Sequence, residues 1–436
     1  MERLIYNELK KWKNDSKRKP LLLQGARQIG KTFIVNQFGK SEYKNYIRLN
    51  FEEDENLKDI FNSTLDPFQI INQLGLYLNK KIEAENTLIF FDEIQVLPKA
   101  ITSLKYFNEN APQFHIIAAG SLLGVSVGKS TSFPVGKVNF LTMYPMNFLE
   151  YLMALKEYFL IDELLNIKDF VAFPDILHEK MLNLMKMYLF LGGMPEVVQE
   201  YIENKDIVAV RKIQNEILQS YQKDFSKYAE PKETIKIAEI WRSIPYQLAK
   251  ENSKFLYSEV KKNARSSHFE QSIDWLKNAG LIHIVNELRT AKLPLGGYAD
   301  LGKFKLYLLD TGLLGAMLEL TPEIILRPDD LYKEYNGAFI ENYACLELVK
   351  LLQKEVFYWT SGNEAEVDFV LQYNNDIIPI EVKSGSNKNT HSLKVFESKN
   401  TTKYLFRTSP RNFVKSEKFI NLPLYRLFAL EEILDL

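Results

Sequence analysis

The chain has only one cysteine among its 436 residues, Cys345, which excludes an internal disulfide and is typical of a reducing compartment. Histidines are also few and scattered, which argues against a zinc site; they are His115, His178, His268, His283 and His391. No run reaches the ~18 consecutive apolar residues of a membrane helix, and the charged N-terminus has no apolar signal-peptide core. We therefore expect a soluble, cytoplasmic protein that makes no membrane contact.

An excess of charge of either sign is missing as well. The 55 Lys and Arg residues nearly balance the 56 Asp and Glu residues, so the net charge is -1. Any contact with nucleic acid must therefore come from local basic patches. The hydrophobic share of 46% is ordinary for a globular protein, and the length predicts about two to four domains.

The first 150 residues alternate short apolar runs with amphipathic segments. This pattern predicts an α/β domain with a parallel sheet flanked by helices. The expected strands are Leu21–Gln24, Asn45–Asn50, Leu88–Phe91, Phe114–Ala119 and Val138–Met143.

Three further segments follow this sheet. Residues 151–228 have the 3.6-residue periodicity of helices. Residues 229–322 predict three helices and then a β-hairpin, which is the layout of a winged helix. Residues 323–436 begin with a helix over Ala338–Leu352 and continue with strands at Val356–Trp359, Glu366–Gln372, Ile377–Lys383 and Lys403–Arg407.

A phosphate-binding loop lies directly after the first strand. The segment matches G-x-x-x-x-G-K-[ST] and opens a helix, as a P-loop must; its residues are Gly25, Ala26, Arg27, Gln28, Ile29, Gly30, Lys31 and Thr32. The loop amides and the helix N-terminus would hold the phosphates of ATP. We expect Lys31 to reach the terminal phosphates and the Thr32 hydroxyl to ligate Mg²⁺.

Two acidic residues end a later apolar strand, LIFFDE. Asp92 suits a magnesium-holding role, and Glu93 is placed to polarise the attacking water. Ser121, after the strand that ends at Ala119, would sense the γ-phosphate. The simpler alternative is an ordinary strand–turn–helix with a solvated acidic turn, but two motifs at suitable spacing favour an ATPase site.

A second polar cluster is expected near the C-terminus. If the chain folds back at Asn374-Asn375, Asp368 and Glu381 fall opposite each other, about 5 Å apart, and can share a divalent cation. Lys383 would project beside Glu381 and act on a metal-bound water or a developing charge, and Glu341 could add a further acid. The alternative is a solvated strand face of mutually paired charges.

Two regions are locally basic. Residues 231–310 contain 13 Lys and Arg against 9 Asp and Glu, and residues 381–411 contain 7 against 2. These patches predict contact with the DNA backbone. The groups nearest the expected recognition helix are Lys261, Lys262, Arg265, Ser266, Ser267, His268 and Gln271. A winged helix used only for protein contacts is the alternative.

The order of these motifs resembles a prokaryotic family of AAA-type ATPases with a C-terminal domain of unknown function (number 4143). The resemblance covers nearly the whole chain and depends on GARQIGKT, FFDEIQ, IIAAGS, FPVGKV, GGMPEVV, KLYLLDTGLL, GAFIENY, EVDFVL and IPIEVKSG. It implies an ATPase core (1–150), a helical lid (151–228), a winged helix (229–322) and a restriction-endonuclease-like domain (323–436).

The resemblance also implies a nuclease motif, namely a helix acid followed by Asp and Glu-x-Lys. This motif maps onto Glu341, Asp368, Glu381 and Lys383. Lys137 stands in FPVGKV where the family leads us to expect an arginine. A homo-oligomer with a trans-acting arginine finger would therefore need another residue, because lysine lacks the bidentate fork.

Three functions follow from these patterns. The leading hypothesis is an ATP-dependent, DNA-acting protein with a candidate metal-dependent nuclease domain. The second is a nucleotide-controlled docking switch whose nuclease-like fold is an inactive scaffold. The third is a DNA-binding regulator.

Overall fold

The computed structural model describes residues 1–120, 133–166, 171–250, 254–321, 330–362, 364–385 and 389–435. By their contacts these residues form two compact units. The N-terminal unit comprises Glu2–Tyr144 and the short segment Asn278–Leu281, and the C-terminal unit comprises Pro145–Lys277 and Ile282–Leu436 with Met1. Among the helices described, none combines the length and the apolar character that a membrane crossing requires.

The N-terminal unit is built on a five-stranded sheet of order β2-β3-β4-β1-β5, in which every neighbouring pair is parallel. The strands are β1 (Leu21–Gln24), β2 (Asn45–Asn50), β3 (Thr87–Asp92), β4 (His115–Ala119) and β5 (Asn139–Thr142). The predicted strands and their parallel arrangement are thus confirmed. Because parallel strands end at the same edge, the carboxyl ends of β1, β3 and β4 lie side by side there.

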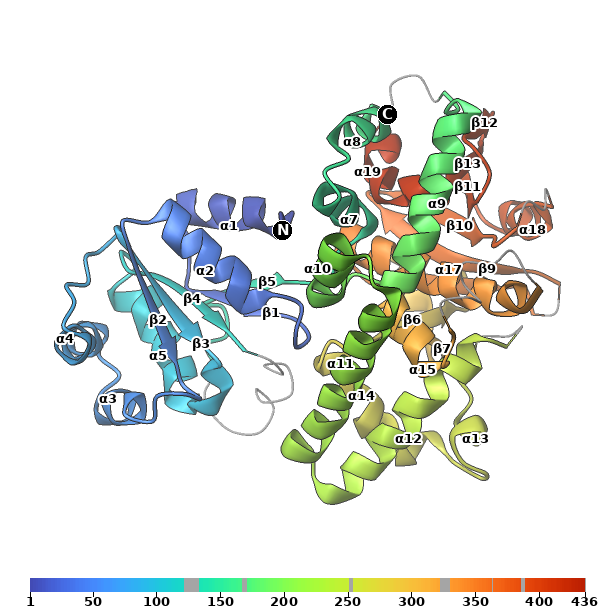
Figure 1. Cartoon of the computed structure of the whole chain (residues 1–436). Coiled ribbons are helices and arrows are strands. Elements are labelled where there is room, and N and C mark those ends of the chain that lie inside the picture. Colours follow the sequence, from blue (N-terminus) through green and yellow to red (C-terminus); the bar gives the residue numbers. More distant parts are fainter. Residues whose placement is uncertain are drawn as a thin grey trace. The chain divides into compact units, whose positions relative to one another are not determined.

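Helices pack against this sheet (Figure 1). They are α1 (Ile5–Asn14), α2 (Lys31–Glu42), α3 (Leu57–Ser63), α4 (Pro67–Leu78) and α5 (Pro98–Asn110). Leu49 and Phe91 of the sheet share one buried core with Phe61 of α3 and Leu104 of α5. The apolar side chains of the strands and of these helices therefore pack together in one core.

The C-terminal unit opens with helices, as the periodicity predicts. They are α7 (Phe148–Ala154), α8 (Tyr158–Leu165), α9 (Asp175–Leu191), α10 (Pro195–Asn204) and α11 (Ile207–Tyr228). Helix α7 starts with a capping box. The Asn147 side chain accepts a hydrogen bond from the Glu150 backbone amide, and the Glu150 side chain accepts one from the Asn147 backbone amide. Helix α9 ends at Gly192, whose φ of 73° lies in the left-handed region.

Three helices and a hairpin follow. They are α12 (Pro231–Leu248), α13 (Tyr257–Val260), α14 (Glu270–Asn278), β6 (Ile282–Leu288) and β7 (Ala299–Leu308). Strands β6 and β7 pair antiparallel, with Ile282 opposite Leu308. This order is the one that the sequence predicts for residues 229–322, and its interpretation as a winged helix stays a prediction.

The hairpin does not stand alone, because β6 also pairs in parallel with β8, with Asn286 opposite Phe357. One eight-stranded sheet results, of order β12-β13-β11-β10-β9-β8-β6-β7. Its other strands are β8 (Phe357–Thr360), β9 (Glu366–Tyr373), β10 (Asp376–Val382), β11 (Leu405–Ser409), β12 (Val414–Ser416) and β13 (Phe419–Pro423). The helices α15 (Thr311–Met317), α17 (Asp330–Leu352), α18 (His391–Lys399) and α19 (Leu430–Leu434) complete the unit. The sheet thus continues across the expected boundary between residues 322 and 323.

A glycine contact fixes the end of α9. The Gly193 amide donates to Asp310 Oδ2 at 2.5 Å, and the Met146 amide donates to the Gly193 carbonyl at 2.7 Å. A Cβ on Gly193 would lie 1.9 Å from the Met146 oxygen, and one on Gly312 would lie 2.2 Å from the Leu191 oxygen. The GGMPEVV and KLYLLDTGLL segments are therefore in backbone contact, which larger residues would prevent.

We predict that Gly193→Ala destabilises the C-terminal unit by ~1–3 kcal/mol, because the new methyl group overlaps a backbone oxygen. Gly297→Ala is the matched control, since its Cβ would meet nothing within 4 Å. Tryptophan fluorescence during urea unfolding is a suitable readout, because Trp241, Trp275 and Trp359 all lie in this unit. Equal midpoints for the two variants would contradict the prediction.

Candidate functional site

The loop between β1 and α2 has the backbone of a phosphate cradle. Gly25, Gln28 and Gly30 have φ values of 141°, 64° and 93°. A Cβ on Gly25 would lie 2.2 Å from the Met143 carbonyl oxygen, so only glycine fits there. Left-handed residues in such a loop turn successive amides toward one side, where they can bind an anion.

Lys31 lies within this loop and is 8% exposed. Its Nζ donates to the carbonyl oxygens of Gly25 at 2.9 Å and of Ala26 at 2.7 Å. Burial lowers the pKa of Lys31 to about 8, although the nearby carboxylates of Glu93 and Asp92 oppose this shift. A poorly hydrated ammonium beside inward-facing amides is well suited to phosphate oxygens.

Asp92, at the end of β3, links the loop to the sheet. Its Oδ1 accepts a 3.3 Å hydrogen bond from the Thr32 hydroxyl, and its Oδ2 accepts from Arg48 Nε at 2.8 Å and Nη2 at 2.7 Å. Burial raises the pKa of Asp92, and the Arg48 guanidinium partly offsets the rise. A hydroxyl and a carboxylate are the hard oxygen donors that Mg²⁺ takes, so Thr32 and Asp92 fit that ion.

Arg48 is the residue of this site that the sequence reasoning missed. It lies in β2, which runs beside β3 with Asn50 opposite Asp92. The available signal was a single charged residue inside the short strand NYIRLN, two positions before its end. Its guanidinium fixes one oxygen of Asp92 and leaves the other toward Thr32.

The remaining predicted residues of the nucleotide site have different outcomes. Glu93 follows β3 with a φ of 53°, and its Oε2 accepts from the Gln95 side chain. Ser121 lies outside the residues that the structure describes. Lys137 forms an ion pair with Glu109 at 2.9 Å. The catalytic roles of Lys31 and Glu93 stay predictions.

The C-terminal cluster has the expected register. The turn at Asn374-Asn375 pairs Tyr373 with Asp376 and Phe369 with Ile380, so Asp368 and Glu381 directly follow the last paired residues of the two strands. Lys383 Nζ lies 3.0 Å from Glu381 Oε1, which confirms that these two side chains project together.

A lysine that the sequence reasoning did not include lies among these acids. Lys305 of β7 is 1% exposed, and its Nζ lies 2.8 Å from Glu341 Oε1 and 2.6 Å from Glu366 Oε1. Burial alone would lower the pKa of Lys305, but Glu341, Glu366 and Asp368 outweigh it and raise that pKa above its ordinary value. A charged residue within the apolar run FKLYLL was the signal for a buried partner.

The acids of the cluster do not fit a divalent metal ion. Besides Glu341 and Glu366, which hold Lys305, Asp368 Oδ2 accepts from the Val382 amide at 2.7 Å. Within the cluster, Glu381 Oε2 is a buried oxygen that has no hydrogen-bond partner among the described residues. In that same part of the chain, no group of three or more His, Cys, Asp and Glu is placed to hold a metal. The acids described here are therefore held by protein donors and do not form a preformed cage of carboxylates for a divalent ion.

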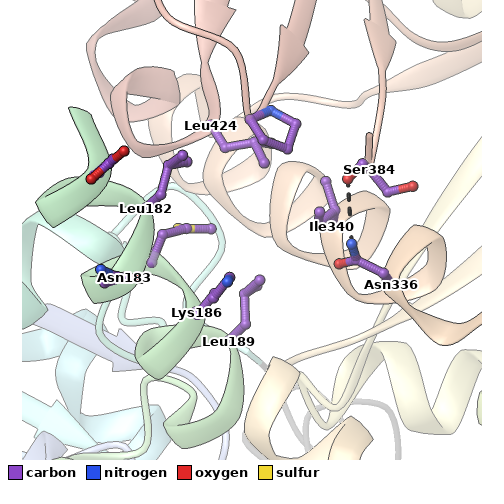
Figure 2. Close-up of a pocket in the computed structure, with 11 residues that line it drawn as sticks. Leu182, Asn183, Lys186, Leu189, Asn336, Ile340, Ser384 and Leu424 are labelled. Carbon is purple, nitrogen blue, oxygen red and sulfur yellow. Dashed lines mark hydrogen bonds between the residues drawn. The ribbon is translucent and has the colours of Figure 1, made fainter. Parts of the chain in front are cut away.

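A pocket of ≈ 500 Å³ lies beside the cluster, between α9 and α17 (Figure 2). Leu182 and Leu189 face Ile340 across it, and the Asn336 amide donates to the Ser384 carbonyl at 3.3 Å. Ser384 directly follows Lys383, yet none of Glu341, Asp368, Glu381 and Lys383 is among the described residues that line the pocket. The pocket therefore does not lead to the acids.

Three family models match separate parts of the chain. Residues 17–152 match an AAA domain, residues 182–324 a domain of unknown function (DUF8612), and residues 336–427 a domain of unknown function (DUF4143). The predicted AAA-type and number-4143 resemblances are thereby confirmed. The restriction-endonuclease-like fold stays a prediction. No curated protein matches the chain.

Several solved structures show a distant likeness. The Walker-type ATPase PABY2304 of Pyrococcus abyssi is 15% identical, with 72% of this chain and 94% of that chain covered and a TM-score of 0.45. The Aeropyrum pernix Orc1 protein in complex with DNA is 13% identical, with 73% and 93% covered and a TM-score of 0.30. At these TM-scores the likenesses carry no argument about function. With its matched AAA domain and its parallel sheet, the N-terminal unit is similar to a P-loop domain of the AAA type.

Proposed function

We propose that this chain binds ATP with Mg²⁺, hydrolyses the ATP, and uses the nucleotide state to control contact with DNA. The observation that carries the proposal is the loop of Gly25–Thr32, with its left-handed residues and its buried ammonium beside the Thr32–Asp92 pair. The AAA-domain match over residues 17–152 supports it.

The loop and the acidic residues at the end of β3 have distinct parts in this proposal. The amides of Gly25–Thr32 bind phosphate oxygens, and Lys31 neutralises charge on the terminal phosphates. Bound at Thr32 and Asp92, Mg²⁺ would stabilise the charge that develops on the phosphates. Arg48 keeps Asp92 oriented, and Glu93 holds the attacking water.

Exposed groups around α14 support a DNA-contacting role. Lys262, Arg265, His268 and Gln271 are all exposed. Helix α14 itself also exposes Glu270 and Asp274, so its surface carries both signs of charge. This mixture favours phosphate contacts from Lys262 and Arg265 over base recognition by the helix.

Metal-dependent cleavage is not part of this proposal. Strands β9 and β10 have the predicted register up to Phe369 and Ile380, but Lys305 already holds Glu341 and Glu366. This arrangement supports one part of the second hypothesis, namely that the C-terminal domain is an inactive scaffold. DNA-stimulated ATPase activity would distinguish a DNA-acting protein from a docking switch.

We predict that Lys31→Ala weakens ATP binding by about 2 kcal/mol or more, roughly 30-fold, because buried phosphate charge loses its partner. Lys40→Ala is the matched control, since Lys40 lies exposed on the same helix. Isothermal titration calorimetry measures both affinities. ATP binding by Lys31→Ala at the unmodified affinity would refute the proposed site.

ATP binding should also depend on pH. Only the protonated Lys31 attracts phosphate, and its pKa in the free protein is about 8. The dissociation constant should therefore stay nearly constant below that pH and rise about tenfold between pH 7 and pH 9. Lys31→Arg should remove this dependence, because arginine does not titrate there. A flat profile for the unmodified chain would show that Lys31 does not control binding.

The pair of changes Lys262→Glu and Arg265→Glu should weaken DNA binding about tenfold or more and reduce the salt slope by about two. Lys17→Glu with Lys40→Glu is the charge-matched control, because both lysines are exposed in the N-terminal unit. Fluorescence anisotropy with duplex DNA at several salt concentrations provides the measurement. If the two double variants have the same DNA affinity and the same salt slope, the segment that carries Lys262 and Arg265 does not bind DNA.

A further inference from the structure

Lys305 has the surroundings of a bound cation. Its ammonium is buried between Glu341 of α17 and Glu366 of β9, at 2.8 and 2.6 Å. The Tyr358 ring lies 5.2 Å from the same nitrogen and adds the attraction of its face. A lone buried ammonium is costly, so these acids are what make its position stable.

The strand that carries Lys305 is firmly held to α17. The Leu308 amide donates to Asn342 Oδ1 at 2.8 Å, and Asn342 Nδ2 donates back to the Leu308 carbonyl at 3.1 Å. Tyr307 donates its hydroxyl hydrogen to Glu341 Oε1. Because β7 is an edge strand, the Asn342 side chain takes the place of a missing neighbouring strand. The backbone of β7 is therefore fixed beside α17, the helix that carries Glu341.

We propose that the Lys305 ammonium is the resident cation of the C-terminal carboxylate cluster, so that this domain takes no divalent metal ion and does not cut nucleic acid. The ammonium supplies the positive charge that Glu341, Glu366 and the neighbouring Asp368 require. Motif residues of a nuclease-like site are thus retained as an internal ion-pair network. This inference does not depend on the nucleotide site.

The test is a titration with Mn²⁺ in the absence of nucleotide. Isothermal titration calorimetry measures Mn²⁺ binding, and the thermal unfolding midpoint measures stability. The unmodified chain should bind no Mn²⁺ at the cluster. Lys305→Met should remove the ammonium from Glu341 and Glu366, lower the midpoint by several degrees, and regain much of that loss on binding one Mn²⁺. Adding Glu381→Gln to Lys305→Met should remove the recovery.

Lys303→Met is the matched control, because Lys303 lies on the same strand with 58% of its side chain exposed. This variant should keep the unfolding midpoint of the unmodified chain and should not bind Mn²⁺ at the cluster. Mn²⁺ binding by the unmodified chain that is lost in Asp368→Asn would overturn the proposal, even if Lys305→Met does not fold. Mn²⁺-dependent nicking of plasmid DNA by the unmodified chain, abolished by Glu381→Gln, would overturn it too.

Discussion

The burial of one ammonium among acidic side chains determines how the parts of the C-terminal unit are joined. Lys305 comes from the hairpin, Glu341 from α17 and Glu366 from the strands that follow, so a single charge holds three segments of the chain together. Asn342 adds a backbone-like pairing to the hairpin edge. Removing Lys305 takes the common partner from both acids, and breaking such a buried contact is strongly destabilising. The hairpin and the C-terminal strands form one sheet through the pairing of β6 with β8, and the contacts of Lys305 strengthen that connection.

The nucleotide site in the N-terminal unit depends on a different constraint, the close approach of backbone segments. Gly25 has no room for a side chain, and the loop keeps Lys31 poorly hydrated beside its own carbonyl groups. Arg48 and Thr32 each hold one oxygen of Asp92. The charges of the site are thus preorganised by the fold, and phosphate binding would exchange the carbonyl contacts of Lys31 for stronger charged ones.

Local patterns were enough to predict much of this structure. The five parallel strands, the P-loop and the hairpin of β9 and β10 follow from short apolar runs, a glycine-rich spacing and one turn. Three-dimensional neighbours were harder to predict. The pairing of β6 with β8 joins segments separated by some 70 residues, and no local pattern encodes it. Lys305 and Arg48 were missed for the same reason, since each finds its acid on a distant element. The short strands β12 and β13 lie near the end of the chain and gave no clear periodic signal.

Hydrogen–deuterium exchange of the whole chain, measured first with Mg²⁺ alone and then with Mg²⁺ and ATP, examines both units in one experiment. ATP should slow the exchange of the amides of Gly25–Thr32, because those amides would bind phosphate. Mg²⁺ alone should leave the amides of β9 and β10 unchanged, because Lys305 already neutralises the neighbouring acids. An unchanged loop in the presence of ATP, or protection of β9 and β10 by Mg²⁺ alone, would contradict this description of the protein.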